Sequence, residues 1–251
     1  MMQVTVLGTG APLCQRIATG MMVQATDCPP LVIDTCGGYE FARQVVRVGR
    51  TLQDLRHIIV THRHMDHIGG MPALFMANKA LDIYALPDTH EGVQALMKAG
   101  FPEWPIHPEV QHHPIAPGEV YDIAGYSVQF FATEHRVPTV AVRVSHAGRT
   151  LAFSADGLPG AAMVAAAQDA DLFLCDAFVA ETANDPLSGR SHQLMHPTGK
   201  DAGTMAAEAG ARALGLLHIG RGTNTDALHA EASAAFGGRT FVCEDGATYQ
   251  V

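Results

Sequence analysis

The chain has 251 residues, a length that suits one large domain, and we treat residues 1–251 as a single domain. Hydrophobic residues make up 47% and charged residues 16%, enough for a large core, yet no apolar run reaches the roughly 20 residues of a membrane span. The formal charge of −9, with 16 scattered basic residues, argues against a nucleic acid as partner.

Short apolar runs and helix-like segments alternate in the first part of the chain. Glycine and proline separate the runs that we predict to be strands, over residues 3–7, 20–26, 30–34 and 81–85. Helices are predicted over residues 38–49, 69–80 and 89–100. No basic segment precedes the first run, so we expect a first strand rather than a signal peptide, and therefore a cytoplasmic location.

Residues 101–118 are rich in proline and histidine, which predicts an ordered surface loop. Four β-like segments follow between residues 119 and 155. The second half returns to helices, over 158–169, 199–213 and 224–236, and to strands, over 171–176, 214–219, 239–243 and 246–251. This order indicates an α/β protein in which two sheets form a sandwich covered by helices.

The most informative segment, residues 61–67, reads Thr-His-Arg-His-Met-Asp-His. It directly follows the apolar run His57-Ile58-Ile59-Val60, which predicts a buried strand, so three histidines and an aspartate gather where that strand ends. Imidazole nitrogens and a carboxylate suit zinc or another borderline divalent ion. His62 and His64 are two residues apart and can face the same side, whereas Asp66 and His67 follow a turn and can reach a second ion. A solvated histidine-rich turn is the alternative.

This segment resembles the H-x-H-x-D-H signature of the metallo-β-lactamase superfamily. Further motifs occur in the order found in that superfamily and extend the resemblance over nearly the whole chain. They are the strand that ends at Asp34, His135 after a β-rich run, Asp156 in Ser-Ala-Asp-Gly, and His218 after the strand Leu-Gly-Leu-Leu. The resemblance implies a four-layer αββα sandwich with metal ligands at one edge.

The resemblance also implies a ligand set for two divalent ions. One ion is held by His62, His64 and His135, the other by Asp66, His67 and His218, and Asp156 bridges them. Zinc is the expected ion, with manganese and iron as alternatives, and a water molecule shared by two such ions becomes a hydroxide nucleophile near neutral pH. Histidine at position 64, where redox di-iron relatives carry glutamate, favours hydrolysis over oxygen chemistry.

Each ligand outside residues 61–67 has an ordinary alternative. His135 suits a loop, His218 a core position and Asp156 a turn before glycine. Asp34 is expected to support a ligand or to cap a helix rather than to bind metal. The five cysteines are odd in number and contain no C-x-x-C pair, which argues against disulfides, and Cys36 is the one beside the metal loop.

Two features resemble the RNase Z-like branch of the superfamily. The opening Leu-Gly-Thr-Gly-Ala-Pro, residues 7–12, either brings backbone N–H groups to an anion or forms a plain strand and turn. His196-Pro197-Thr198, followed by an alanine-rich helix, resembles an H-S-T element. That resemblance implies that His196 donates a proton to the leaving group, with a capping or loop role as the alternative. Arg221 either reaches a phosphate or is simply solvated.

The chain also departs from that branch. The tRNA-processing endonucleases carry a long basic arm between the ligands at the positions of His135 and Asp156. Only 20 residues separate the two here, which allows a hairpin and no tRNA clamp. The element around Asp156 lacks its usual threonine.

We therefore predict a dinuclear metal-dependent hydrolase that acts on a small phosphodiester, cyclic or derived from a nucleotide, with Asp66 and His196 as catalytic residues. The first alternative is a hydrolase of lactones, carboxylic esters or sulfate esters. In that case residues 101–118 and 177–198 would form the walls of an apolar pocket. A tRNA 3′-processing endonuclease and a non-catalytic metal-binding scaffold are less favoured. We expect a small-molecule substrate and no membrane partner, and the resemblance is compatible with a homodimer.

Overall fold

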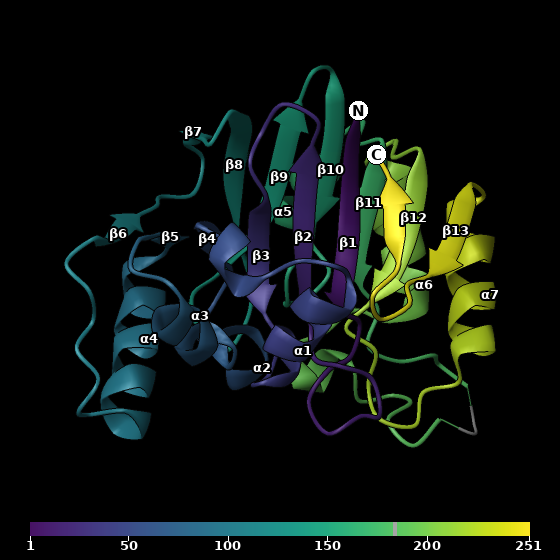
Figure 1. Cartoon of the computed structure of the whole chain (residues 1–251). Helices are drawn as coiled ribbons and strands as arrows, with labels where there is room; N and C mark the ends of the chain where they lie inside the picture. The colour runs from purple at the N-terminus through teal and green to yellow at the C-terminus, as the bar shows by residue number, and fades with distance from the viewer. Residues whose placement is uncertain (183–184) are drawn as a thin grey trace.

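The computed structural model describes residues 1–182 and 185–251, in which the apolar runs form two mixed sheets that face each other (Figure 1). The first sheet has the order β14-β1-β2-β3-β4-β5-β6. Its strands are β1 (Met2–Gly8), β2 (Gly20–Ala25), β3 (Leu31–Thr35), β4 (His57–Val60), β5 (Leu81–Ala85), β6 (Val110–Pro114) and β14 (Thr248–Gln250).

The second sheet has the order β13-β12-β11-β10-β9-β8-β7. Its strands are β7 (Val120–Ile123), β8 (Tyr126–Thr133), β9 (Thr139–His146), β10 (Arg149–Phe153), β11 (Leu172–Asp176), β12 (Ala213–Leu217) and β13 (Arg239–Val242).

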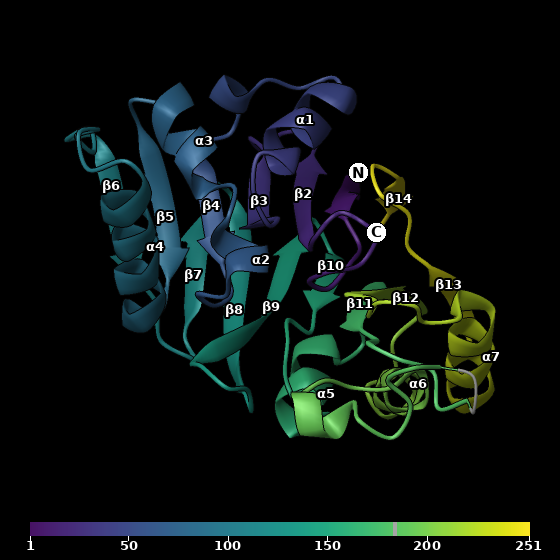
Figure 2. The ribbon, with the colours of Figure 1, turned by 90° about the horizontal axis from the view of Figure 1, so that it is seen from below.

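Helices cover the outer face of each sheet, which gives four layers (Figure 2). The first sheet carries α1 (Glu40–Arg47), α3 (Met71–Ala77) and α4 (Pro87–Gly100), while the short α2 (Met65–Ile68) lies near its edge. The second sheet carries α5 (Ala161–Ala167), α6 (Gly199–Glu208) and α7 (Thr225–Phe236). Single 3₁₀ turns occur at η1 (Leu52–Asp54) and η2 (His192–Leu194).

Three apolar clusters hold these layers together. The largest lies between the sheets and includes Val4, Ile33, Phe130 and Phe153, all at most 1% exposed. A second cluster packs the first sheet against α1, α3 and α4, and a third packs the second sheet against α5, α6 and α7. Because the inner and outer faces of both sheets are buried, the central strands are apolar on both sides, which explains their continuous apolar runs.

The direction of the strands places functional side chains. Strands β3, β4, β5 and β6 run parallel to one another, and so do β10, β11, β12 and β13. Parallel strands need long crossovers, here mostly helical, and their carboxyl ends meet at one edge of the sheet. Loops that leave β3, β4, β10, β11 and β12 therefore converge at the lower end of the sandwich in Figure 1.

The α/β sandwich predicted from the sequence is confirmed, and most predicted elements occur within a few residues of their predicted bounds. The prediction that residues 101–118 form only a loop is wrong, because β6 pairs with β5 there. Its prolines, its histidines and its exposed edge position hide the alternation typical of strands. The helix predicted to reach residue 213 ends at Glu208, because Gly210 adopts a left-handed φ of 65°.

None of the helices in the described residues combines the length and the apolar character that crossing a membrane requires. The five cysteines are unpaired, as the sequence predicted.

Tyr126 links the two sheets through its hydroxyl group, which supplies a test of this packing. The hydroxyl accepts a hydrogen bond from the Ala25 N–H at 2.8 Å and donates one to the Pro29 carbonyl at 3.1 Å. Burial raises the pKa of Tyr126 to about 12, so the group keeps its proton.

We expect Tyr126→Phe to lower the free energy of unfolding by about 1–3 kcal/mol, because a buried N–H loses its partner. Urea denaturation measures this change. Tyr39→Phe is the control. It also removes a tyrosine hydroxyl, but Tyr39 is 57% exposed, so the free energy of unfolding should change by less than about 0.5 kcal/mol. Equal effects of the two substitutions would show that the hydroxyl of Tyr126 does not link the sheets.

Candidate metal centre

Strand ends position every member of the centre. The metal loop, residues 61–67, leaves the buried strand β4, and His135 lies just beyond β8. Asp156 and His218 follow the ends of β10 and β12. The structure thus brings all seven predicted metal-binding side chains together in two groups that share Asp156.

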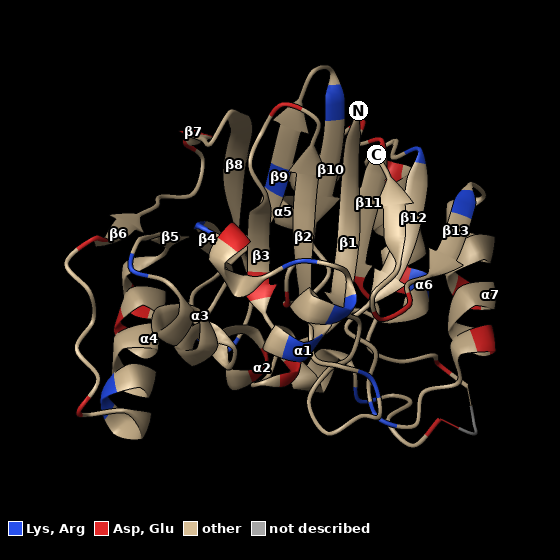
Figure 3. Cartoon of the chain, in the orientation of Figure 1, with Lys and Arg blue, Asp and Glu red and all other residues tan. Residues whose placement is uncertain are grey.

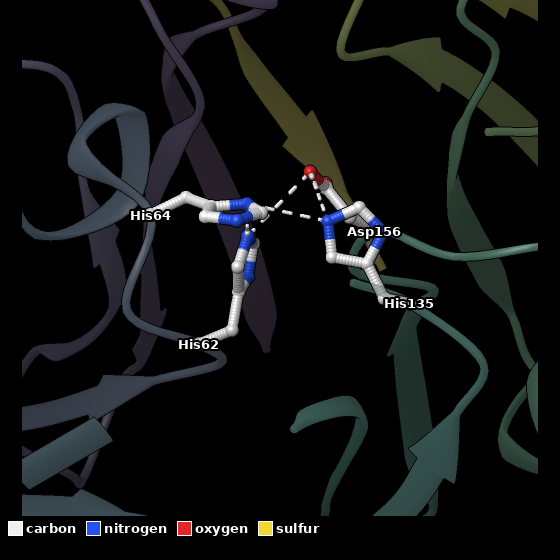
Figure 4. A group of neighbouring side chains, drawn as sticks. All are labelled: His62, His64, His135 and Asp156. Atoms are coloured by element: carbon white, nitrogen blue, oxygen red, sulfur yellow. Dashed lines mark hydrogen bonds and ion pairs between the residues drawn. The ribbon is translucent and has the colours of Figure 1, made fainter. Parts of the chain in front are cut away.

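The first group consists of His62, His64, His135 and Asp156 (Figure 4). Nδ1 of His64 lies 3.1 Å from Nε2 of His62 and 3.2 Å from Nε2 of His135. Oδ2 of Asp156 lies 3.6 Å from Nε2 of His62 and 3.9 Å from Nε2 of His135. Ligand atoms around a tetrahedral ion with bonds of 2.0–2.1 Å are about 3.3 Å apart, so the spacing suits one zinc-type ion.

The second group consists of Asp66, His67, Asp156 and His218. Nε2 of His67 lies 3.4 Å from Oδ2 of Asp66 and 3.4 Å from Oδ2 of Asp156. Nε2 of His218 lies 3.3 Å and 3.4 Å from the same two oxygens. One carboxylate oxygen of Asp156 therefore faces rings of both groups, as a bridging ligand does.

Hydrogen bonds at the back of the rings determine which nitrogen faces the centre. The Thr61 hydroxyl donates its proton to Oδ2 of Asp34 at 2.8 Å, so it can only accept from Nδ1 of His62, 3.1 Å away. The same Asp34 oxygen lies 2.7 Å from Nδ1 of His67 and accepts its proton. The Met195 carbonyl lies 3.3 Å from Nδ1 of His135. In each of these three rings the unprotonated nitrogen is therefore Nε2, and its lone pair points toward the centre.

The two groups differ in electrostatics. Burial lowers the pKa of His62 well below its usual range and lowers the pKa of His135 to about 4, so both rings are neutral at pH 7. Burial alone would also lower the pKa of His67 and of His218, but the surrounding carboxylates, Asp156 first among them, together outweigh it and raise the pKa of both. The second group attracts positive charge, and a divalent ion competes with protons for it.

Buried polar atoms without partners mark the same place. Among the described residues, Nε2 of His67 and Oδ1 of Asp156 are buried and accept or donate no hydrogen bond. Such atoms are costly to bury unless something binds them. The orphaned atoms and the nitrogen and oxygen donor set both fit two divalent ions.

Close backbone packing supports the metal loop. A Cβ atom on Gly69 would lie 2.3 Å from the Gly37 carbonyl, and one on Gly70 would lie 2.1 Å from the Thr35 carbonyl. The φ angles of both glycines are ordinary, −61° and −82°, so space rather than conformation requires glycine. The loop is thereby pressed against the segment that carries Asp34, and Asp34 itself adopts a left-handed φ of 59°.

His196 lies beside the centre, and sequence reasoning missed its partner, Asp176. Nδ1 of His196 lies 2.7 Å from Oδ2 of Asp176, which is fully buried at the end of β11. The ring stacks on Phe178, with 4.6 Å between ring centroids. A nitrogen of His196 lies within 4.8 Å of ligand-type atoms of Asp156 and His218. The signal for Asp176 was a predicted strand that ends in an aspartate at the edge where the ligands gather.

The structure argues against an anion site in the glycine-rich opening. The backbone N–H groups of Thr9, Gly10 and Ala11 donate to Asp245, Ile17 and Ile219, respectively. These donors are therefore not available to an anion, and the strand-and-turn alternative holds. Cys36 is buried, and burial raises the pKa of its thiol well above the usual range, so it is not a reactive group.

Two clefts flank the loop formed by residues 13–16. One, of about 390 Å³, is lined by Asp66, Met65 and Ile17 beside this loop. The other, of about 520 Å³, is lined by Arg221 and Thr223 together with residues of the same loop. The guanidinium of Arg16 is already bonded to the Thr9 hydroxyl and the Cys243 carbonyl, so Arg221 is the cation of this region that faces outward.

The two segments predicted to wall a pocket have different positions. Residues 101–109 and β6 lie at the outer edge of the first sheet beside α4, away from the centre, so they do not wall it (Figures 1 and 2). Residues 177–198, of which 183 and 184 lie outside the described residues, do contribute. Phe178, Leu187 and Leu194 form a small apolar cluster next to His196.

Known proteins share this fold and its motifs. Residues 30–219 match the β-lactamase superfamily domain. Ribonuclease Z of Halorubrum lacusprofundi is 28% identical over 311 aligned positions, which cover 100% of this chain and 97% of that protein. Among solved structures, the metallo-β-lactamase fold protein YhfI of Bacillus subtilis has a TM-score of 0.84 at 24% identity, covering 99% of this chain and 98% of that one. A diphosphatase of the PhnP family has a TM-score of 0.75 at 18% identity, covering 100% and 98%.

The match spans most of the chain, and the motifs from residue 61 onward all fall within or at the end of it. The chain therefore belongs to the metallo-β-lactamase superfamily, in its RNase Z-like branch, and is a metal-dependent hydrolase.

Proposed function

We propose that the two groups hold two divalent ions, with zinc as the native metal. The first ion would be bound by His62, His64 and His135, the second by Asp66, His67 and His218, and Asp156 would bridge them. The support is geometric, because each set of ligand-type atoms lies within 4.8 Å and the sets share one carboxylate. Two such ions activate water and polarise a scissile phosphoryl or carbonyl group.

We propose that the substrate is a small phosphodiester, cyclic or derived from a nucleotide. The observation that carries this proposal is His196, held by Asp176 at the rim of the centre. Asp176 accepts the Nδ1 proton and orients the ring, so Nε2 is the atom that would donate a proton to a leaving alkoxide. Alkoxides are poor leaving groups that need this proton. The names of relatives, ribonuclease Z and diphosphatase, also point to phosphorus–oxygen bonds.

A short hairpin supports a small substrate over tRNA. Strands β9 and β10 occupy the region between His135 and Asp156 and are joined by Ala147 and Gly148, both with positive φ. This two-residue turn leaves no room for an arm. The alignment with ribonuclease Z spans 311 positions against 251 residues, so at least 60 positions of that protein have no counterpart here. In the view of Figure 3, the Lys and Arg positions are dispersed along the ribbon.

The other end of a small diester would lie in the clefts beside residues 13–16. Asp66 lines the first cleft directly, so a group bound there would be in reach of the second metal group. Arg221 lines the second cleft and is available to a phosphate oxygen.

An ester or lactone is the second candidate. Phe178, Leu187 and Leu194 present apolar surface next to His196, which suits a carbonyl substrate with an apolar chain. The same ions would polarise its carbonyl group.

The first test measures turnover of bis(p-nitrophenyl) phosphate together with the metal content of the same sample. Asp66→Ala should reduce turnover to background and remove about one ion per chain relative to the unmodified protein, with the fold retained by circular dichroism. Asp226→Ala, at the exposed start of α7, is the matched control. Activity that survives Asp66→Ala would contradict the dinuclear assignment.

Substrates separate the two candidates in the same assay. If the metal-loaded protein turns over p-nitrophenyl acetate or γ-lactones but no phosphodiester, the phosphodiester proposal is wrong. Tight metal binding with no turnover of any of these compounds would favour a scaffold.

Asp34 provides a test of ring orientation. Asp34→Asn replaces an oxygen that accepts protons from Thr61 and His67, and should weaken metal binding about 10- to 100-fold. Competition with a chelator measures the affinity. Asp54 lies in an exposed 3₁₀ turn, so Asp54→Asn should leave the metal affinity unchanged. Unchanged affinity in Asp34→Asn would remove the proposed role of Asp34.

His196→Ala should reduce turnover of substrates with alkoxide leaving groups by about 10²- to 10⁴-fold, because the leaving oxygen loses its proton donor. The loss should be much smaller for p-nitrophenolate, which needs little protonation. Asp176→Asn should show the same dependence on leaving group through misorientation of the ring. Equal losses for both classes of leaving group would contradict a proton-donor role.

A further inference from the structure

Three side chains of kinds that can bind metal ions lie close together at the end of the sandwich opposite the candidate metal centre. Asp27 and Cys28 lie in the turn between β2 and β3 of the first sheet. His146 is the last residue of β9 in the second sheet. Both turns lie at the upper end of the sandwich in Figure 1, whereas α2 and the metal loop lie at the lower end. None of these three residues contributes to the proposed hydrolytic centre.

The contacts within this trio are close. Sγ of Cys28 lies 3.6 Å from Nδ1 of His146. Oδ1 of Asp27 lies 2.9 Å from Nε2 of the same ring. One ligand atom from each of the three residues lies within 4.8 Å of the other two.

The ring of His146 has acceptors on both sides. The Gly125 carbonyl lies 3.1 Å from Nδ1, so a proton on Nδ1 is donated to it. In that neutral tautomer Nε2 presents its lone pair beside the Asp27 carboxylate oxygen 2.9 Å away, so either a proton or a metal ion can be shared by the two groups. A histidine that donates one N–H to a backbone carbonyl keeps its other nitrogen available as a metal ligand.

We propose that Asp27, Cys28 and His146 bind one further divalent ion, of the zinc class, which ties the two sheets together. Sulfur, nitrogen and oxygen donors select zinc-like ions over magnesium and calcium, which prefer oxygen ligands alone. Asp27 is the most exposed of the three, with 73% of its side chain accessible, so an ion can reach the trio from solvent.

The local charge favours a cation over a nucleophilic thiol. Burial, with the carboxylates of Asp27 and Asp122, raises the pKa of Cys28. A thiol with a raised pKa is a poor nucleophile at neutral pH, so a Cys-His-Asp relay does not activate it. The same negative charges attract a metal ion, which then displaces the thiol proton.

The turn is held in place before any ion binds. The Gln24 amide donates to the Cys28 carbonyl at 2.7 Å, and the Tyr126 hydroxyl donates to the Pro29 carbonyl. Gly125 has a φ of 89°, and a Cβ atom there would approach Sγ of Cys28 to 3.0 Å. Glycine at this position leaves room for the thiol, and a site formed in advance binds an ion at a lower entropic cost.

Cobalt substitution tests the site by a signal that the hydrolytic centre does not produce. A thiolate bound to Co²⁺ gives a near-ultraviolet charge-transfer band, and the seven residues of the hydrolytic centre include no cysteine. We expect the full chain loaded with Co²⁺ to show this band. Cys28→Ser should abolish it and remove one Zn²⁺ per chain relative to the unmodified protein, while phosphodiester turnover stays unchanged.

Further variants separate a metal site from a simple ion pair. His146→Gln should weaken the binding that produces the band about 10- to 100-fold, measured by titration with Co²⁺. Cys14→Ser changes the other half-buried cysteine and should leave the band intact. Absence of the band in the unmodified protein, its persistence in Cys28→Ser, or an unchanged zinc content in that variant would each overturn the proposal, whatever the result of the turnover assays.

Discussion

The orientation of two rings of the candidate centre, His62 and His67, depends on one buried carboxylate. Asp34 accepts hydrogen bonds from the backbone N–H and the hydroxyl of Thr61 and from the ring of His67. Through Thr61 it also determines the tautomer of His62. If these bonds were lost, either ring could turn its protonated nitrogen toward the centre and would no longer be a ligand. The left-handed φ of Asp34 and the glycines packed against its loop maintain that position.

The parallel strands explain why such a dense polar cluster can form inside an apolar sandwich. Strands that run in the same direction present their carboxyl ends at one edge, where backbone polar groups and side chains escape the core. Asp156, Asp176 and His218 come from three neighbouring strands of the second sheet. Their loops face the metal loop of the first sheet, so ligands distant in sequence meet within a few ångströms.

The two ends of the sandwich have different chemistry. At the lower end, buried histidines and carboxylates suit hydrolysis, and His196, held by Asp176, is the proposed proton donor for a poor leaving group. At the upper end, the two-residue turn Ala147-Gly148 joins β9 to β10. That turn brings His146 against Asp27 and Cys28, a softer and more exposed set of ligands. The shortened hairpin thus supports both the preference for a small substrate and the proposed structural ion.

The sequence by itself determined the sandwich class and the candidate ligands, because periodicity reports burial and H-x-H-x-D-H requires only local spacing. It did not reveal Asp176 or β6, since a partner 20 residues away and an exposed edge strand leave no periodic signal. Tertiary structure also decided that the N–H groups of the glycine-rich opening are occupied by Asp245 and other acceptors. Contacts of this kind depend on how distant segments pack, and no local pattern encodes which donor finds which acceptor.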